Sequence, residues 1–60
     1  MKIIVTIPAY NEEKTIGKII NEIKTFMKNY NYKILVVNDG STDNTKKIAH
    51  DNGVIVYSNP

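Results

Sequence analysis

Three apolar segments alternate with two amphipathic ones along the chain. Residues 2–7 are mostly β-branched and nearly continuous in apolarity, which is typical of a strand buried on both faces of a parallel sheet. Pro8 has no N–H to donate to a sheet and is expected to end this strand. Residues 33–38 repeat the pattern, and residues 54–57 form a shorter apolar run. The pattern therefore predicts three strands.

The first amphipathic segment predicts a helix that begins near Asn11. Asn11 can cap the helix, with Glu12 and Glu13 in the first turn, where acids suit the helix dipole. The apolar positions then recur at spacings of three and four residues over about four turns. They are Ile16, Ile19, Ile20, Ile23, Phe26, Met27 and Tyr30. Residues 29–31 are expected to end the helix.

The second amphipathic segment predicts a shorter helix. Ser41 or Thr42 can cap it, and it is expected to run to about Asn52, with Gly53 as the residue after its C-cap. Asn52 and Gly53 would also suit a hairpin turn. Residues 41–51 lack the alternation of a strand, so we favour the helix.

Two consecutive βαβ units with right-handed crossovers predict an α/β fold with a three-stranded parallel sheet in the order 3-2-1. Both helices then lie on one face, although both faces of the first two strands are apolar. Strand 2–7 would also be an exposed apolar edge, which soluble proteins avoid. We therefore expect that more chain follows Pro60, or that self-association hides the open face.

The composition of the chain disfavours several classes of protein. The net charge of +2 comes from eight lysines and six acids, without arginine and without a clustered basic stripe, so nucleic-acid binding is disfavoured. Without cysteine, no disulfide or thiolate metal site can form. No apolar run reaches the roughly 18 residues of a membrane span, and Met1–Val5 is too short for a signal peptide. A cytoplasmic location is expected, either free or at the cytoplasmic face of a membrane through segments further along the full protein.

Candidate chemistry lies in the loops after the first two strands, because ligands bind beyond the carboxyl ends of parallel strands where strand order reverses. Tyr10 offers a flat face to a base, and the Asp39 carboxylate can accept a hydrogen bond from uracil N3–H or guanine N1–H. Glu12 can accept from ribose hydroxyls. Each residue could instead have a purely structural role. Tyr10 could cover the end of the first helix, and Asp39 and Gly40 could form an ordinary turn. Glu12 could interact only with the helix dipole.

Other polar and aromatic residues are interpreted as structural. Asp43 is expected to be an acid of the second helix's first turn, and His50 a cation near its end. Phe26, Tyr30 and Tyr32 are expected to pack in or around the core. The first strand is not followed by G-x-G-x-x-G, and the chain has no G-x-x-x-x-G-K-[ST], which disfavours a dinucleotide site and excludes a P-loop.

Two segments together carry a family resemblance. Residues 7–13 (IPAYNEE) and 36–45 (VVNDGSTDNT) resemble the two opening signatures of inverting family 2 glycosyltransferases with the GT-A fold. Their separation by one amphipathic helix also matches, and the resemblance covers nearly all 60 residues. It implies that residues 1–60 are the N-terminal nucleotide-sugar-binding half of a GT-A (Rossmann-like) domain. Within the family, the motifs look most like the polyprenyl-phosphate (dolichol-phosphate mannose or glucose) synthase branch.

The resemblance implies a set of residues that contact the nucleotide of a GDP- or UDP-sugar. Tyr10 would pack on the base, Asp39 would accept from its N–H edge, and Pro8 and Val37 would shape the floor. Glu12 completes the set. The sequence departs from the family at Asn38, where many members carry an acid.

The same resemblance implies that catalysis needs more than these residues. The family's Asp-x-Asp motif, which holds Mg²⁺ or Mn²⁺ against the diphosphate, and its general base lie further along than Pro60. The 60 residues are therefore expected to be inactive alone, without a catalytic residue or metal ligand, and to need the rest of the domain. The full enzyme would transfer the sugar to an acceptor such as a polyprenyl phosphate. The alternative is a non-catalytic nucleotide-binding or oligomerising α/β module.

Overall fold

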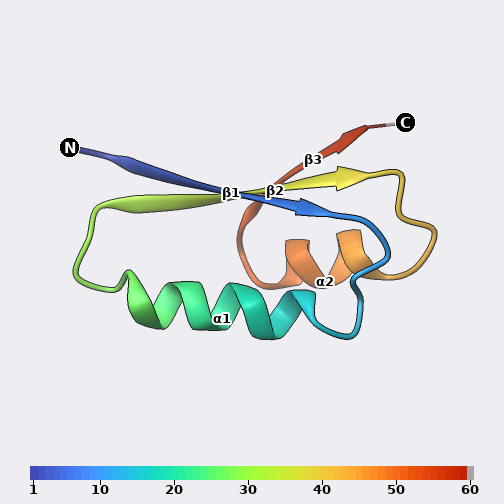
Figure 1. Cartoon of the computed structure of the whole chain (residues 1–60), viewed down its shortest axis with the longest axis horizontal. Coiled ribbons are helices and arrows are strands. Elements are labelled where there is room, and N and C mark those ends of the chain that lie inside the picture. The colour runs from blue at the N-terminus through green and yellow to red at the C-terminus, as the bar shows by residue number, and fades with distance from the viewer. Residues whose placement is uncertain (60) are drawn as a thin grey trace.

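The three β-branched segments form one parallel sheet, and both helices pack on the same face of it (Figure 1). The computed structural model describes residues 1–59. The elements are β1 (Ile3–Ala9), α1 (Ile16–Phe26), β2 (Tyr32–Asp39), α2 (Thr45–Asp51) and β3 (Ile55–Asn59). The strand order β1-β2-β3 is the predicted order 3-2-1 counted from the other edge, so the predicted α/β topology is confirmed. Pro60 lies outside the described residues.

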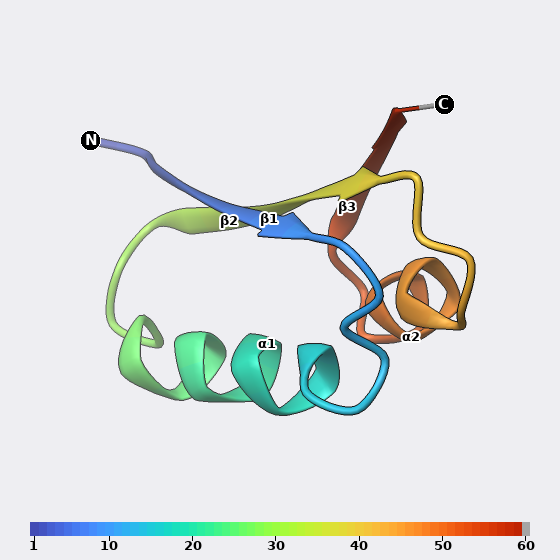
Figure 2. The ribbon, with the colours of Figure 1, turned by 45° about the vertical axis from the view of Figure 1, so that its right-hand side comes forward.

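The register aligns the carboxyl ends of the strands. Ala9 of β1 pairs with Asn38 of β2, and Asp39 pairs with Asn59 of β3. Because the strands are parallel, the loops that follow β1 and β2 leave the sheet at the same end. Figure 2 shows both loops descending from that end towards the helices.

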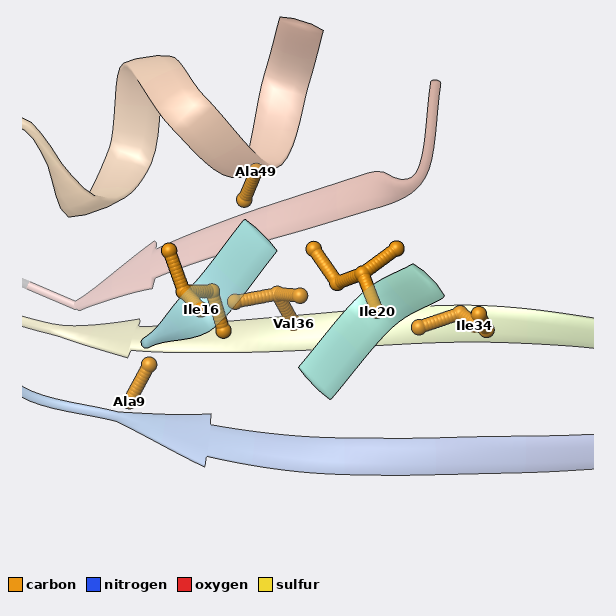
Figure 3. Close-up of a cluster of buried hydrophobic side chains, with 6 residues drawn as sticks. All are labelled: Ala9, Ile16, Ile20, Ile34, Val36 and Ala49. Atoms are coloured by element: carbon orange, nitrogen blue, oxygen red, sulfur yellow. The ribbon is translucent and has the colours of Figure 1, made fainter. Parts of the chain in front are cut away.

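The core lies between the sheet and the two helices. Ile16 and Ile20 of α1 lie over Val36 and Ile34 of β2, and Ala49 of α2 closes one side (Figure 3). Ile16, Ile20, Val36 and Ala49 have no exposed surface. This layer is the apolar stripe that the three- and four-residue spacing predicts.

The opposite face of the sheet carries apolar side chains without a covering layer among the described residues. Ile4, Ile55 and Tyr57 are 56%, 52% and 59% exposed. They alternate with the inward-facing positions of their strands, as the pleat requires. The expectation that two helices leave one apolar face uncovered is confirmed for residues 1–59.

Strand β1 is longer than predicted, because it continues through Pro8 to Ala9. Pro8 pairs in register with Val37. In an edge strand a proline is tolerated where its nitrogen faces away from the neighbouring strand, because no ladder hydrogen bond is then lost. The expectation that Pro8 ends the strand is therefore wrong.

Helix α1 begins later and ends earlier than predicted. The backbone N–H groups of Thr15 and Ile16 both donate to the Glu12 carbonyl, at 3.0 and 2.8 Å, so residues 12–15 form a turn before the helix. Asn11 is consequently not the N-cap. Phe26 is 78% exposed at the end of α1, so its expected packing is wrong.

The tyrosines that follow α1 divide between surface and core. Tyr30 is 55% exposed, whereas Tyr32 packs against the core at the start of β2.

Helix α2 is also shorter than predicted, because it starts at Thr45, with Asn44 at the N-cap position. Its end agrees with the sequence: Gly53 has φ 75° and its N–H donates to the His50 carbonyl at 3.0 Å. A left-handed residue after a C-cap is the position that glycine favours. Within residues 1–59, neither helix has the length and apolarity needed to cross a membrane.

Candidate functional site

Tyr10 and Asp39 lie at the same end of the sheet. Each directly follows a paired residue, Ala9 in β1 and Asn38 in β2. Tyr10 is 59% exposed, and Asp39 is exposed as well. The topology thus brings an aromatic ring and a carboxylate to adjacent strand ends, where both are accessible to a ligand.

Pro8 and Val37 lie beside this pair on the uncovered face. They are register partners, with Pro8 exposed and Val37 half-buried. The alternation of β2 places Val37 and Asp39 on the same face of the sheet and Asn38 on the other. Within residues 1–59 the Asp39 carboxylate receives no hydrogen bond, so its oxygens are available as acceptors. Pro8, Val37 and Asp39 therefore lie on the same face of the sheet, with Tyr10 directly after the end of β1.

Glu12 is held by hydrogen bonds to both its backbone and its side chain. Its backbone N–H donates to the Thr45 hydroxyl at 2.7 Å, and its carboxylate accepts from the Thr15 hydroxyl at 3.1 Å. Because α1 starts only at Ile16, Glu12 is not in a first helical turn. Its side chain remains exposed.

The loops after β1 and β2 are joined by hydrogen bonds between the side chains of one and the backbone of the other. The Asn11 N–H donates to the Ser41 hydroxyl at 3.0 Å, and the Thr42 N–H donates to Asn11 Oδ1 at 2.8 Å. Asn11 has φ 51°, in the left-handed region that asparagine tolerates better than most residues. Sequence reasoning assigned Asn11 to a helix cap and missed this link.

A second link involves two acids. The Glu13 N–H donates to Asp43 Oδ2 and the Asn44 N–H donates to Glu13 Oε1, both at 3.3 Å. Asp43 Oδ1 also accepts from the N–H of Thr45, at 2.9 Å, and from its hydroxyl. Asp43 precedes α2 and joins the loops, so its predicted place in the first helical turn is wrong. The sequence alone does not reveal this role of Asp43, because its hydrogen-bond partner Glu13 lies 30 residues away.

The surroundings of Asp43 lower its pKa. Partial burial raises the pKa of the carboxyl, but the hydrogen bonds from the Thr45 hydroxyl, the Thr45 N–H and the Glu13 N–H together outweigh it. The net pKa is below the ordinary value of 3.8. A lowered native pKa means that the charged carboxylate stabilises the fold above the unfolded pKa. That stability is lost as the pH falls through the native pKa.

We expect Asp43→Asn to lower the melting temperature at pH 7, because its amide turns a donor towards the Glu13 N–H. The difference from the wild type should shrink as the pH falls below about 4, where the carboxyl of the unfolded chain begins to protonate, and further as the pH falls through the lowered native pKa. Thermal melts from pH 7 to about pH 2 measure this. Asp51→Asn is the control, since its exposed pair with Lys47 contributes little. A difference that stays constant with pH would contradict the assignment.

Asn38, the departure from the family pattern, faces the helices. It is 4% exposed, its Oδ1 accepts from the Ser41 N–H at 3.2 Å, and its Nδ2 donates to the Ser58 hydroxyl at 3.3 Å. An amide can both accept and donate here, which an ionised carboxylate cannot. Asn38 therefore ties the loop after β2 to β3, and it lies on the opposite face from Val37 and Asp39.

One hollow of about 370 Å³ lies at the amino ends of β2 and β3, at the other end of these strands from Asp39. It is lined by Lys24, Tyr32, Lys33, Gly53 and Val54, among others. It contains none of the predicted site residues. No group of three or more His, Asp or Glu side chains in residues 1–59 could hold a metal ion. The candidate site is thus an open surface without a metal-binding cluster of its own.

Comparison with known proteins decides the family. The family model for glycosyl transferase family 2 matches residues 4–60. The chain belongs to glycosyl transferase family 2. The match includes both loops of the candidate site, so the resemblance of residues 7–13 and 36–45 to family 2 is confirmed.

Similar proteins are longer than this chain. Protein RfbJ from Shigella flexneri is 45% identical over 58 residues, which are 97% of this chain and 43% of that protein. The UDP-N-acetylglucosamine–dolichyl-phosphate N-acetylglucosaminyltransferase of Methanococcus voltae is 51% identical over 46 residues, 75% of this chain and 17% of that enzyme. The chain therefore spans less than half the length of these relatives.

The solved structures confirm the fold family. Glucosyl-3-phosphoglycerate synthase from Mycobacterium tuberculosis, in complex with Mn²⁺, uridine diphosphate and phosphoglyceric acid, superposes with a TM-score of 0.82 at 36% identity. The match covers 95% of this chain and 20% of that one. The sheet and helices of this chain are therefore those of a GT-A glycosyltransferase.

Proposed function

We propose that this segment binds the nucleotide of a GDP- or UDP-sugar donor. The observation that carries the proposal is the pair formed by Tyr10 and Asp39, which extend accessible side chains from adjacent strand ends. A solved relative that shares this fold was crystallised with uridine diphosphate, which supports a nucleotide diphosphate as the ligand class.

The chemistry of the candidate site suits a nucleoside. The Tyr10 ring provides a stacking face for a base, and Pro8 and Val37 add apolar surface beside it. The Asp39 carboxylate accepts from the ring N–H that uracil and guanine both carry, and cytosine and adenine lack. The Glu12 carboxylate can accept hydrogen bonds from the ribose hydroxyls.

We infer the rest of the reaction from the relatives. The full protein would transfer the sugar with inversion, and the relative from Methanococcus voltae supports a polyprenyl phosphate as acceptor. A divalent ion is inferred from the Mn²⁺ of the solved relative. Residues 1–59 offer no cluster of metal ligands, so the ion would be held by residues outside this segment. These 60 residues would then bind the donor without transferring its sugar.

Asp39→Ala tests the assignment of the base-binding carboxylate. It should weaken binding of UDP or GDP by about 1–3 kcal/mol, because a hydrogen bond to a charged acceptor is lost. Calorimetric titration of the wild type and the variant measures this. Glu22→Ala, which removes an exposed carboxylate on α1, is the control and should bind normally.

Two results would contradict the proposal. One is a folded Asp39→Ala variant with unchanged nucleotide affinity. The other is a wild-type protein that binds neither UDP nor GDP.

A further inference from the structure

Asn11 makes three of the hydrogen bonds that join the loops of the candidate site. Its backbone N–H donates to Ser41, and its side-chain oxygen accepts from the Thr42 N–H and, more weakly at 3.4 Å, from the Thr42 hydroxyl. Asn11 lies between Tyr10 and Glu12, and its partners follow Asp39 and Gly40. It therefore links the segment that carries the ring to the segment that carries the carboxylate.

The residue type fits this double role. At φ 51° most side chains are strained, whereas glycine and asparagine are tolerated. Glycine would keep the backbone path and lose the acceptor for the Thr42 N–H. Asparagine supplies both the conformation and the acceptor, and aspartate comes closest to it.

We propose that Asn11 is a positioning residue for the donor site, which rests on the nucleotide-binding function proposed above. Asn11 sets the spacing between Tyr10 and Asp39 without contacting the nucleotide. The two loops have no backbone-to-backbone hydrogen bond between them within residues 1–59. Side chains such as Asn11 therefore determine how the loops sit together.

Asn11→Gly is the most direct test, because it keeps the positive φ and removes the acceptor. We expect UDP or GDP affinity to fall about tenfold, and hydrogen exchange of the Thr42 amide to accelerate. Asn11→Asp, which retains an acceptor oxygen, should restore most of the affinity. Asn44→Ala is the matched control in the neighbouring loop, since no hydrogen bond uses its side chain within residues 1–59.

A second control separates positioning from general destabilisation. Ile20→Val destabilises the core away from the site, and it should leave nucleotide affinity unchanged while Asn11→Gly lowers it. If Asn11→Gly also keeps wild-type affinity at a temperature where it is folded, the positioning role is overturned. Equal losses in Asn11→Gly and Asn11→Asp would overturn it too. A wild type that binds no nucleotide would instead overturn the proposed function, and the role of Asn11 with it.

Discussion

Ile20→Ala is expected to remove about 2–5 kcal/mol of folding free energy. Ile20 has no exposed surface and lies over β2 in the centre of the core. A chain of 60 residues has a total stability of only about 3–9 kcal/mol by the usual value per residue. The variant should therefore lose a large share of its stability, which urea unfolding monitored by circular dichroism measures.

Ile19→Ala is the matched control for this prediction. It makes the same substitution one position earlier in α1, where the side chain is 37% exposed. Less apolar surface is lost and a smaller cavity remains, so the cost should be clearly smaller. Equal destabilisation by the two variants would mean that the stripe of α1 facing the sheet is assigned incorrectly.

Thr45→Val is expected to cost about 2–4 kcal/mol, because it leaves the Glu12 N–H without an acceptor and removes one of the hydrogen bonds to the Asp43 carboxylate. Thr45 is fully buried, and its hydroxyl accepts from the Glu12 N–H and donates to Asp43. Valine has the same shape and fills the same space, so the change isolates the hydroxyl. Thermal or urea unfolding measures the loss.

Thr45→Ser supplies the comparison. Serine keeps the hydroxyl and gives up one methyl group, so it should retain more stability than valine. If valine is tolerated better than serine, packing rather than hydrogen bonding holds the start of α2 against the first loop. The account of the joined loops would then be wrong at this position.

The sequence predicts the strands well because their signal is local and redundant. The β-branched run of β2 is apolar on both faces, and the two βαβ connections leave one parallel arrangement with right-handed crossovers. Gly53 is also predictable, since a glycine after a helical segment signals a left-handed C-cap. These features depend on neighbours within a few residues.

The starts of the helices are less predictable because their partners are distant. Asn11 has the composition of an N-cap, but its oxygen bonds to Thr42, 31 residues away. Pro8 normally ends a strand, and only its place in an edge strand allows it to remain. Such outcomes depend on which segments meet in space, and local pattern carries no information about that.

The candidate site divides in the same way. Tyr10 and Asp39 follow from topology, because residues after adjacent parallel strands leave the same end of the sheet. Topology does not predict the hydrogen bonds that hold these loops, which are made by Asn11, Asp43 and Thr45. They join side chains to backbone across about 30 residues, and several different pairings would satisfy the same residue types.

A nucleotide titration followed residue by residue tests the central claim most directly. The protein is labelled with ¹⁵N, and its amide resonances are recorded as UDP, and separately GDP, is added. We predict saturable shifts confined to residues 10–13 and 37–42, with Tyr10 and Asp39 among the largest. Shifts that gather instead around the hollow near Lys24 and Gly53, or no saturable shifts with either nucleotide, would contradict the account.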